Sequence, residues 1–329
     1  MKTMASEPSL CGSNIEKPFL SVVMPVHHGE RWLAQALDSI SLQNSSGIEC
    51  IILDSSDNDA CERIVEGFRS RLSIRYERNV DVLSWPSKTN LGVERARAEH
   101  VAMLHQDDLW LPDRSKLVRQ ALEAFPAAVL FLNPSHIVDQ NGRRLGTWRC
   151  PLAGRRALEC REVAERLLIQ NFVAIPAPVI SRRAWLAAGG LDPDLWYTAD
   201  WDLYLKLLRQ GTAVYQPVPS TAFRVHGSSL TVSGSRHRAE FKEQMNIVLD
   251  RHIELAPARK RSQIRRRAAA SIAINCELAR AASGDASAIG RAITEILLLG
   301  PRQAVRYLRD SRILERALPR VRARLAGTF

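Results

Sequence analysis

The sequence predicts an α/β fold in which a Rossmann-type, mostly parallel sheet is flanked by helices and followed by a helical C-terminal extension. In the first half of the chain, short apolar runs alternate with segments whose apolar residues recur at helical spacing. Strands that alternate with helices are joined by right-handed crossovers and pair in parallel. From about residue 235 onward the spacing is helical throughout. Since 46% of the chain is hydrophobic and 25% is charged, it can bury a substantial core.

Four strands and four helices are expected in the first 125 residues. The strands are short apolar runs, and the helices carry apolar residues three or four positions apart. The fourth helix has Pro112 near its first turn, where proline is well tolerated. The expected strands are 19–26, 48–54, 72–78 and 100–105, and the expected helices are 30–43, 60–71, 87–99 and 112–125.

The pattern is less regular after residue 135. The pair Asn141-Gly142 lies between apolar runs and indicates a hairpin. The run 174–181 predicts another strand, and a short helix after it would stop at two glycines. A further helix begins near Asp200. We expect three parts, namely a flexible N-terminus (1–17), an α/β domain (18–234) and a basic helical extension (235–329).

The positive charge belongs to the C-terminal segment. The chain has a net charge of +11, and residues 259–329 hold 16 Arg or Lys against 5 Asp or Glu, so the remainder is neutral. Two roles remain open for an amphipathic bundle of this kind. It could dock on anionic lipid headgroups, or it could be a solvated face of an extension that covers the core. No nucleic-acid-binding motif accompanies the charge, so we expect no nucleic acid partner.

Several protein classes are disfavoured. The six cysteines have no CxxC spacing, which argues against a zinc site or disulfide framework and fits a reducing compartment. No apolar stretch approaches the roughly 20 residues of a membrane span, and the N-terminus lacks the apolar region of a signal peptide. Neither a GxGxxG fingerprint nor a phosphate-binding P-loop is present. We expect a cytoplasmic protein, or one peripheral on the inner face of the membrane.

Polar residues stand at the carboxyl ends of three predicted strands. They are Pro25-Val26-His27, Asp54 and His105-Gln106-Asp107-Asp108. Ligands of open parallel sheets bind beyond these ends, so we expect the three groups to converge. Two adjacent carboxylates repel each other and need a cation nearby.

Four segments resemble successive signatures of the family 2 inverting glycosyltransferases, which have the GT-A fold. Their order and spacing, from about Phe19 to about Thr231, make the resemblance specific. The segments are FLSVVMPVHHGERWLAQALDSI, IILDSSDNDA, SKTNLGVERARAEHVAMLHQDDLWLPDRSKLVRQ and AAGGLDPDLWYTADWDLYLKLLRQG.

The resemblance implies a hexosyltransferase-type enzyme that depends on Mn²⁺ or Mg²⁺. Such an enzyme moves a sugar from a UDP-, dTDP- or GDP-linked donor to a hydroxyl of a saccharide or lipid-linked acceptor. The implied setting is the synthesis of cell-envelope polysaccharide or glycolipid.

The resemblance also implies roles on the donor side. At the DxD motif, Asp108 would hold the metal, while Asp107 would contact the donor ribose or the metal's waters. His226 would add a metal or diphosphate contact. The remaining donor-side residues would surround the nucleotide, with Asp54 reading the base, and they are Pro25, Val26, His27, Asp54, Lys88, Asn90 and His105.

On the acceptor side, the resemblance makes Asp200 the catalytic base that takes the proton of the acceptor hydroxyl. A carboxylate at a helix N-terminus is held ionised by the free amides there. Trp196 and Trp201 would contact the acceptor. Two positions depart from the family pattern, since His105 stands where a carboxylate is common and Ala199 where a glutamate is.

Structural interpretations remain open for these residues. The aspartate pair could cap the helix after Pro112, and His105 could be an ordinary core histidine. Lys88 could be a solvated helix-face charge, Asp54 a turn residue and Asp200 an N-cap. For the whole protein, the rival is a non-catalytic nucleotide-sugar-binding or membrane-docking scaffold of the same fold. The joint presence of Asp108 and Asp200 favours the enzyme.

Overall fold

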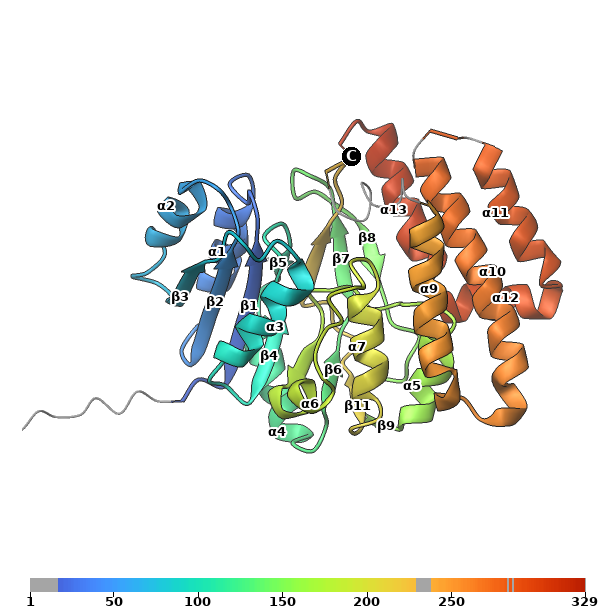
Figure 1. Cartoon of the computed structure of the whole chain (residues 1–329), viewed down its shortest axis with the longest axis horizontal. Coiled ribbons are helices and arrows are strands. Elements are labelled where there is room, and N and C mark those ends of the chain that lie inside the picture. The colour runs from blue at the N-terminus through green and yellow to red at the C-terminus, as the bar shows by residue number, and fades with distance from the viewer. Residues whose placement is uncertain (1–16, 229–237, 283, 286, 329) are drawn as a thin grey trace, which may run out of the picture.

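The computed structural model describes residues 17–228, 238–282, 284–285 and 287–328. Figure 1 shows strands in the N-terminal two thirds and a stack of helices in the C-terminal third. The expected α/β fold with a helical C-terminal extension is confirmed. The boundary expected at residue 234 and nearly all of the segment 1–17 lie outside the described residues, so the division into three parts stays a prediction.

The main sheet has eight strands, and its first four are parallel. β1 and β2 are rich in apolar, β-branched residues and are buried along their whole length because helices cover both faces, whereas β3 at the edge is more polar and partly exposed. Beyond them β10 runs antiparallel to both of its neighbours. In sheet order the strands are β3 (Ser73–Arg78), β2 (Ile48–Asp54), β1 (Leu20–Val26), β4 (His100–Met103), β10 (Val179–Ser181), β6 (Leu130–Leu132), β11 (Ala213–Tyr215) and β9 (Ala157–Leu158).

Seven helices accompany the strands up to residue 207, and the expected ones lie within a few residues of their predicted bounds. The third illustrates how sequence sets a boundary, because Ser84 caps its first turn and Pro86 follows directly. The helices are α1 (Leu33–Ser41), α2 (Ala60–Glu66), α3 (Trp85–Arg95), α4 (Arg114–Ala124), α5 (Cys160–Leu167), α6 (Arg182–Ala187) and α7 (Ala199–Leu207).

A second sheet of four strands lies beside the first. The predicted hairpin at Asn141-Gly142 is confirmed, and it joins two antiparallel strands of this sheet. Asp139 stabilises the turn because its Oδ1 accepts from the backbone N–H groups of Asn141 and Arg143, each at 2.9 Å. The strands, in sheet order, are β5 (Leu109–Trp110), β12 (Thr221–Arg224), β7 (Ser135–Val138) and β8 (Arg144–Trp148).

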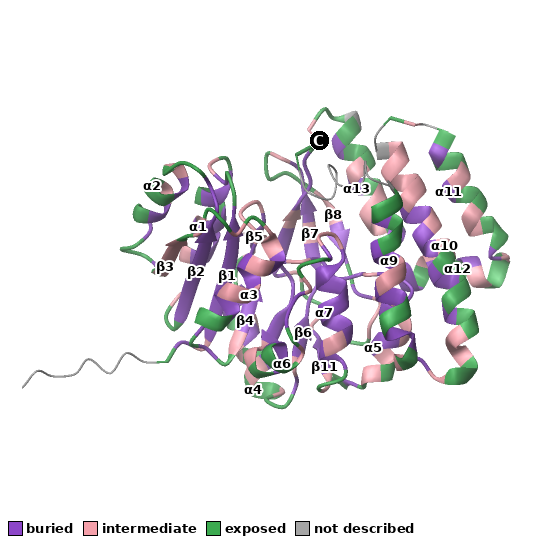
Figure 2. Ribbon diagram, viewed as in Figure 1, coloured by how far each residue is buried: buried purple, intermediate pink, exposed green. Residues whose placement is uncertain are grey.

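The C-terminal helices share the main hydrophobic core with the sheet. Ile264, Ile272, Tyr307 and Ile313 are buried in the same cluster as strand residues such as Ile51. Figure 2 shows this continuity, with exposed residues along the outer side of the last helices. None of the helices within the described ranges is long and apolar enough to cross a membrane. The elements are α9 (Arg238–His252), η1 (Ile253–Leu255), α10 (Ala258–Ala282), α11 (Ser287–Leu298), α12 (Pro301–Ser311) and α13 (Ile313–Leu325).

Candidate active site

Strand register brings the polar strand ends to one edge of the main sheet. Val26 at the end of β1 pairs with Asp54 at the end of β2, and Val23 pairs with Met103 near the end of β4. The residues that follow these strands therefore meet, as the sequence predicts.

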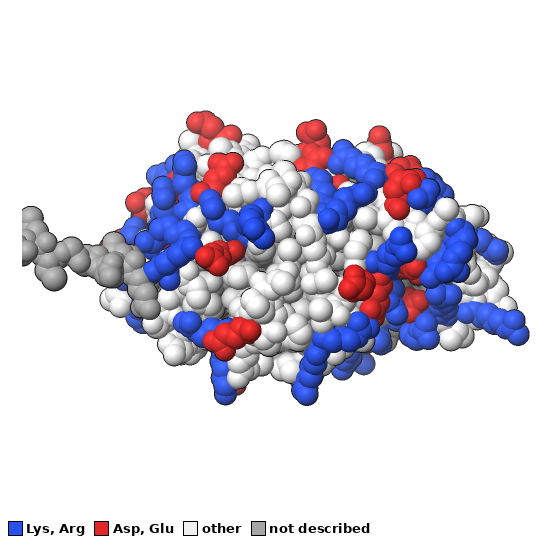
Figure 3. Space-filling view, turned by 90° about the horizontal axis from the view of Figure 1, so that it is seen from below, with Lys and Arg blue, Asp and Glu red and all other residues white. Residues whose placement is uncertain are grey.

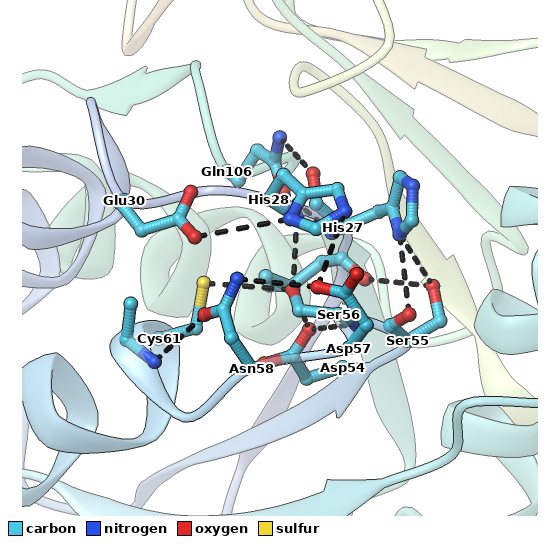
Figure 4. Close-up of polar contacts among 12 residues, drawn as sticks. His27, His28, Glu30, Asp54, Ser55, Ser56, Asp57, Asn58, Cys61 and Gln106 are labelled. Carbon is cyan, nitrogen blue, oxygen red and sulfur yellow. Dashed lines mark hydrogen bonds and ion pairs between the residues drawn. The ribbon is translucent and has the colours of Figure 1, made fainter.

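Gln106 joins two of the strand ends directly. Its Oε1 accepts from the backbone N–H of His27 at 2.8 Å, and its Nε2 donates to the carbonyl of His27 at 3.0 Å. The Nδ1 of His27 lies 3.2 Å from the carbonyl of Ser55, which follows β2. Figure 4 shows this cluster of side chains. No role for Gln106 was predicted from the sequence, because an uncharged glutamine gives no signal of its own there.

Asp54 is fully buried, and both of its oxygens are engaged. Oδ1 accepts from the backbone N–H and the hydroxyl of Ser56 at 2.8 and 2.6 Å, and Oδ2 accepts from the Tyr76 hydroxyl at 2.8 Å. Burial and the nearby carboxylate raise the pKa of Tyr76, so its hydroxyl stays a donor. Asp54 thus has the contacts of a turn aspartate, and its role in reading a nucleobase stays a prediction.

Lys88 is buried beneath the same edge, with a side chain that is 2% exposed. Its Nζ donates to the carbonyl of Val26 at 2.6 Å and to the hydroxyl of Ser55 at 2.8 Å. Burial lowers the pKa of Lys88 to about 8, although the charge of Asp54 opposes the shift. The alternative that Lys88 is a solvated helix-face charge is therefore wrong.

The two adjacent aspartates differ in their surroundings. The Nε2 of His226 donates to Oδ2 of Asp107 at 2.8 Å. Burial is the largest single influence and would raise the pKa of Asp107, but the hydrogen bond from His226 and the electrostatic effects of His105 and His226 together outweigh it, and the pKa lies below its ordinary value. Asp108 is 1% exposed, and its Oδ2 has no hydrogen-bond partner in the described part of the chain. Burial and the neighbouring Asp107 raise the pKa of Asp108.

Arg224 on β12 is a cation in direct contact with this pair, and it was not identified from the sequence. Its backbone N–H donates to Oδ1 of Asp108 at 2.9 Å, and its Nε donates to the carbonyl of Asp107 at 2.7 Å. The guanidinium also reaches the carbonyl of Gln140 at 3.0 Å and Oε1 of Gln35 at 2.9 Å. The only signal in the sequence is an arginine inside an otherwise apolar strand, two residues before His226.

Two structural alternatives concern this loop, a capping role for the aspartate pair and a core position for His105, and only the second agrees with the structure. The N-cap residue of α4 is Asp113, so the aspartate pair does not cap that helix. His105 is buried against the ring of Trp85 with 5.2 Å between centroids, and its Nε2 has no hydrogen-bond partner among the described residues. Burial lowers the pKa of His105, which favours the neutral imidazole. It is a core histidine with one unsatisfied nitrogen.

The chemistry of the acidic loop fits a divalent cation that is shared with a ligand. Within the described ranges, no group of three or more His, Cys, Asp and Glu side chains could hold a metal ion by itself. The unpaired buried Oδ2 of Asp108 is nevertheless an oxygen ligand of the kind that Mg²⁺ and Mn²⁺ prefer. Mg²⁺ commonly binds one or two carboxylates and completes its shell with substrate phosphates and water.

Asp200 lies in a second polar cluster, at the start of α7. The N-cap residue of this helix is Thr198, so Asp200 is not the N-cap. Its Oδ2 accepts from Nδ2 of Asn171 at 3.0 Å, and its Oδ1 accepts from the backbone N–H of Trp201 at 2.8 Å. Burial raises the pKa of Asp200 to about 6, and the hydrogen bond from Asn171 opposes the shift. At neutral pH the carboxylate is therefore largely ionised and can accept a proton.

The basic C-terminal segment reaches this cluster through Arg316 on α13. Its Nη1 donates to the carbonyl of Asn171 at 3.3 Å, and its guanidinium lies 4.8 Å from the Trp148 ring centre. The positive charge of Arg316 also acts on the carboxylate of Asp200. Neither Asn171 nor Arg316 was identified from the sequence, because no motif surrounds them.

Three residues that were predicted to contact the donor or the acceptor have side chains that bind other groups of the protein. The side chain of Asn90 binds the backbone of Leu191 through Nδ2 at 2.8 Å and Oδ1 at 2.9 Å. Trp201 is 3% exposed, and its indole N–H donates to the carbonyl of Leu167 at 2.8 Å. Trp196 is half-buried, and its indole N–H donates to Glu240 on α9. The roles of these three toward donor and acceptor stay predictions.

Comparisons of the sequence with known proteins agree on one class of enzyme. The family model described as "Glycosyl transferase family 2" matches residues 21–187, which is half of the chain. An uncharacterized glycosyltransferase of Rickettsia typhi is 23% identical over 230 residues, covering 70% of this chain and 71% of that relative. One from Methanocaldococcus jannaschii is also 23% identical, over 59% of this chain and 66% of that relative.

Solved structures show the same fold. The crystal structure of residues 1–349 of TarS from S. aureus matches with a TM-score of 0.58 and 14% identity, over 94% of this chain and 92% of that one. The structure of the same fragment with UDP-GlcNAc has a TM-score of 0.54 and 13% identity, over 84% of this chain and 88% of that one. The mannosyltransferase PcManGT from Pyrobaculum calidifontis, in complex with GDP-Man and Mn²⁺, has a TM-score of 0.53 and 16% identity, over 96% and 89%. With the GT-A fold of these enzymes and a family model that spans half its length, the chain belongs to glycosyl transferase family 2.

Proposed function

We propose that this protein is a metal-assisted, inverting glycosyltransferase that transfers a sugar from a nucleotide-sugar to a hydroxyl acceptor. One observation carries the proposal. The chain holds a buried carboxylate at a strand end, Asp108, with one oxygen that has no partner among the described residues, and a second carboxylate of raised pKa at a helix start, Asp200. A donor site and a base are the two parts that such a transfer needs.

The donor would bind at the strand ends. Asp108 would hold Mg²⁺ or Mn²⁺ together with the donor diphosphate, and Asp107 and His226 would lie beside the ion, which supplies positive charge to the leaving diphosphate. His27 is held by Gln106 and Ser55 and would contact the nucleobase of the donor. Beneath it would lie Pro25, Val26, Asp54 and Lys88. Solved structures of the same fold were obtained with UDP, UDP-GlcNAc and GDP-Man. We therefore propose a UDP-, dTDP- or GDP-linked sugar.

Asp200 would take the proton of the acceptor hydroxyl. The hydrogen bonds from Asn171 and from the backbone of Trp201 hold both carboxylate oxygens in a fixed orientation. Because its pKa is about 6, Asp200 combines an ionised state at neutral pH with appreciable basicity. We propose that the acceptor is a saccharide or lipid-linked hydroxyl of cell-envelope polysaccharide or glycolipid synthesis.

The acceptor's attachment to lipid would suit a protein that is peripheral on the cytoplasmic face of the membrane. Ile289, Ile293 and Leu297 recur every fourth residue on α11 and are each about half exposed or more. In Figure 3, Lys and Arg side chains gather over the end of the molecule that the C-terminal helices form. An apolar stripe with surrounding positive charge fits anionic headgroups, which enrich the cytoplasmic leaflet.

Sedimentation with vesicles tests this membrane contact. We expect vesicles that contain phosphatidylglycerol to bind the protein, phosphatidylcholine vesicles not to bind it, and Ile293→Gln with Leu297→Gln to reduce binding several-fold. Leu42→Gln is the matched control, since Leu42 is at least as exposed but lies directly after α1. Equal binding by all three proteins contradicts the contact.

A donor screen followed by turnover tests the central proposal. Nucleotide-sugars are screened by thermal shift with Mn²⁺, because a ligand that binds the folded state raises its melting temperature. With the donor found, Asp108→Asn and Asp200→Asn should stay folded and lose at least about a thousandfold in transfer rate. The rival is a scaffold that binds the donor without chemistry, and it predicts a thermal shift but neither transfer nor metal-dependent donor hydrolysis by the wild-type protein.

A further inference from the structure

A cavity of about 260 Å³ lies between α5, α10 and α12, apart from the strand ends and from Asp200. Basic side chains outnumber acidic ones on its walls. The acidic side chains are Glu162, Glu165 and Asp310. The basic ones are Arg161, Arg166, Lys260, Arg267, Arg306 and Arg309.

The acidic side chains already have partners. Glu165 binds the Nζ of Lys260 at 2.6 Å, and Glu162 binds Nη2 of Arg156 at 2.6 Å. Asp310 lies among three arginines, with Nε of Arg309 at 3.0 Å, Nε of Arg306 at 3.5 Å and Nη1 of Arg267 at 3.8 Å. One carboxylate shared by three guanidinium groups leaves positive charge uncompensated.

Arg267 is the group that points to a ligand. Its side chain lines the cavity, yet the residue is only 4% exposed. Its Nε and Nη1 are buried without a hydrogen-bond partner among the described residues. Leaving a charged donor buried and unsatisfied costs more than leaving a neutral one, so such groups in a folded protein call for a missing partner. Burial and the nearby Arg306 lower the pKa of Arg267, which shows that its charge is poorly compensated.

We propose that this cavity is a binding site for a phosphate-class oxyanion, distinct from the donor site. Guanidinium groups match the geometry of phosphate oxygens and bind them through paired hydrogen bonds. A dianion placed here would satisfy Arg267 and would balance the excess charge of Arg306 and Arg309. The source of the phosphate is either a free anion or the headgroup of a phospholipid.

The site would act on the same elements that hold the candidate base. Gln170 follows α5, and its Oε1 accepts from the Ser271 hydroxyl and from Nδ2 of Asn275 on α10, each at 2.7 Å. The next residue is Asn171, which donates to Asp200. An anion that draws α5, α10 and α12 together would therefore help to fix the segment that carries Asn171.

Thermal shift with inorganic phosphate tests the site, with sodium chloride at equal ionic strength as reference. At a phosphate concentration well above the dissociation constant, we expect the melting temperature to rise by about 2 °C in the wild type. The double variant Arg306→Gln/Arg309→Gln should lose the rise, and Arg267→Gln should lose it as well if that variant folds. The matched control is Arg302→Gln, an exposed arginine of α12 outside the cavity, which should keep the rise.

A second arm separates the two sources of phosphate. Vesicles of phosphatidylcholine with phosphatidic acid are sedimented with the wild type, the double variant and the Arg302→Gln control. A phosphate-induced rise that is lost only in the double variant supports a site for free anions. Vesicle binding that is lost only in the double variant, without a rise from free phosphate, supports a site for headgroups. If neither readout differs between the double variant and the control, the proposal is overturned.

Discussion

The Nδ2 of Asn171 lies 3.0 Å from Oδ2 of Asp200 and donates a hydrogen bond to it. This contact joins the segment after α5 to the start of α7. A hydrogen bond to a carboxylate stabilises the charged form and lowers its pKa, and here it opposes the larger effect of burial. Asn171 therefore acts on the candidate base as a positioning residue.

The pH dependence of transfer should report this contact. In the wild type, kcat/KM should fall about tenfold per pH unit below pH 6, because protonated Asp200 cannot accept a proton. Asn171→Ala removes a donor to the charged form, so the pKa of Asp200 should rise by roughly one unit and the acid limb should move to higher pH. Asn44→Ala, at an exposed residue between α1 and β2, is the control and should leave the profile unchanged. An unchanged limb in Asn171→Ala would contradict the role given to the contact.

Replacing Asp108 with asparagine should raise the stability of the metal-free protein and abolish its response to metal. The carboxylate is buried beside Asp107, so Asp108→Asn removes a like-charge repulsion and keeps the acceptor for the backbone N–H of Arg224. We expect the free energy of unfolding in urea to rise by about 1 kcal/mol without metal. The stabilisation that Mn²⁺ gives with a donor should disappear in the same variant. A variant that is less stable without metal, or that still responds to Mn²⁺, would speak against Asp108 as the metal-binding oxygen.

Arg224 should be one of the most sensitive positions of the fold. Its guanidinium donates to the backbone or side chain of Asp107, Gln140 and Gln35 in a buried setting. Arg224→Met removes the donor to the carbonyl of Asp107 and one of two donors to the carbonyl of Gln140, and it removes a positive charge beside the acidic pair. We expect a loss of about 2–4 kcal/mol in the free energy of unfolding, measured by urea denaturation.

The control for Arg224 is an exposed arginine close by. Arg31→Gln removes one hydrogen bond to Gln140 at the surface, and it should change the free energy of unfolding by less than about 0.5 kcal/mol. If both variants lose the same small amount, the buried network around Arg224 does not carry the stability assigned to it.

The strand ends could be predicted from the sequence because their signals are local. Apolar, β-branched runs mark β1, β2 and β4, and a parallel sheet brings their carboxyl ends together whatever the rest of the chain does. The acidic pair follows one of these runs directly. Its position needed no knowledge of distant contacts.

Apart from the hairpin at Asn141-Gly142, the second sheet could not be predicted in this way, and neither could the surroundings of Asp200. The strand β5 has only two residues, which is too short for a periodic pattern. Asn171 and Asp200 are 29 positions apart, and Arg316 lies 145 positions after Asn171. Such contacts depend on tertiary packing. The sequence left two roles open for the arginine-rich tail, docking on lipid or packing on the core, and it did not indicate that α13 packs on β8 and reaches the cluster around the candidate base.

Gly92 should tolerate no side chain, because α3 packs closely on the main sheet there. A Cβ at this position would lie 2.4 Å from Cγ1 of Val23 and 3.1 Å from Cδ2 of Leu53. Overpacking of this kind should cost Gly92→Ala about 1–2 kcal/mol in the free energy of unfolding, even after the gain in helix propensity. Gly290→Ala is the matched control on α11, where a Cβ meets nothing within 4 Å, and it should gain about 0.5–1 kcal/mol.

The clash at Gly92 also predicts coupling with Val23. Val23→Ala opens a cavity that the new methyl group can fill, so the double variant should lose less stability than the sum of the two single losses. Urea denaturation of the four proteins completes the cycle. Strict additivity would contradict the predicted contact between the new methyl group and Val23.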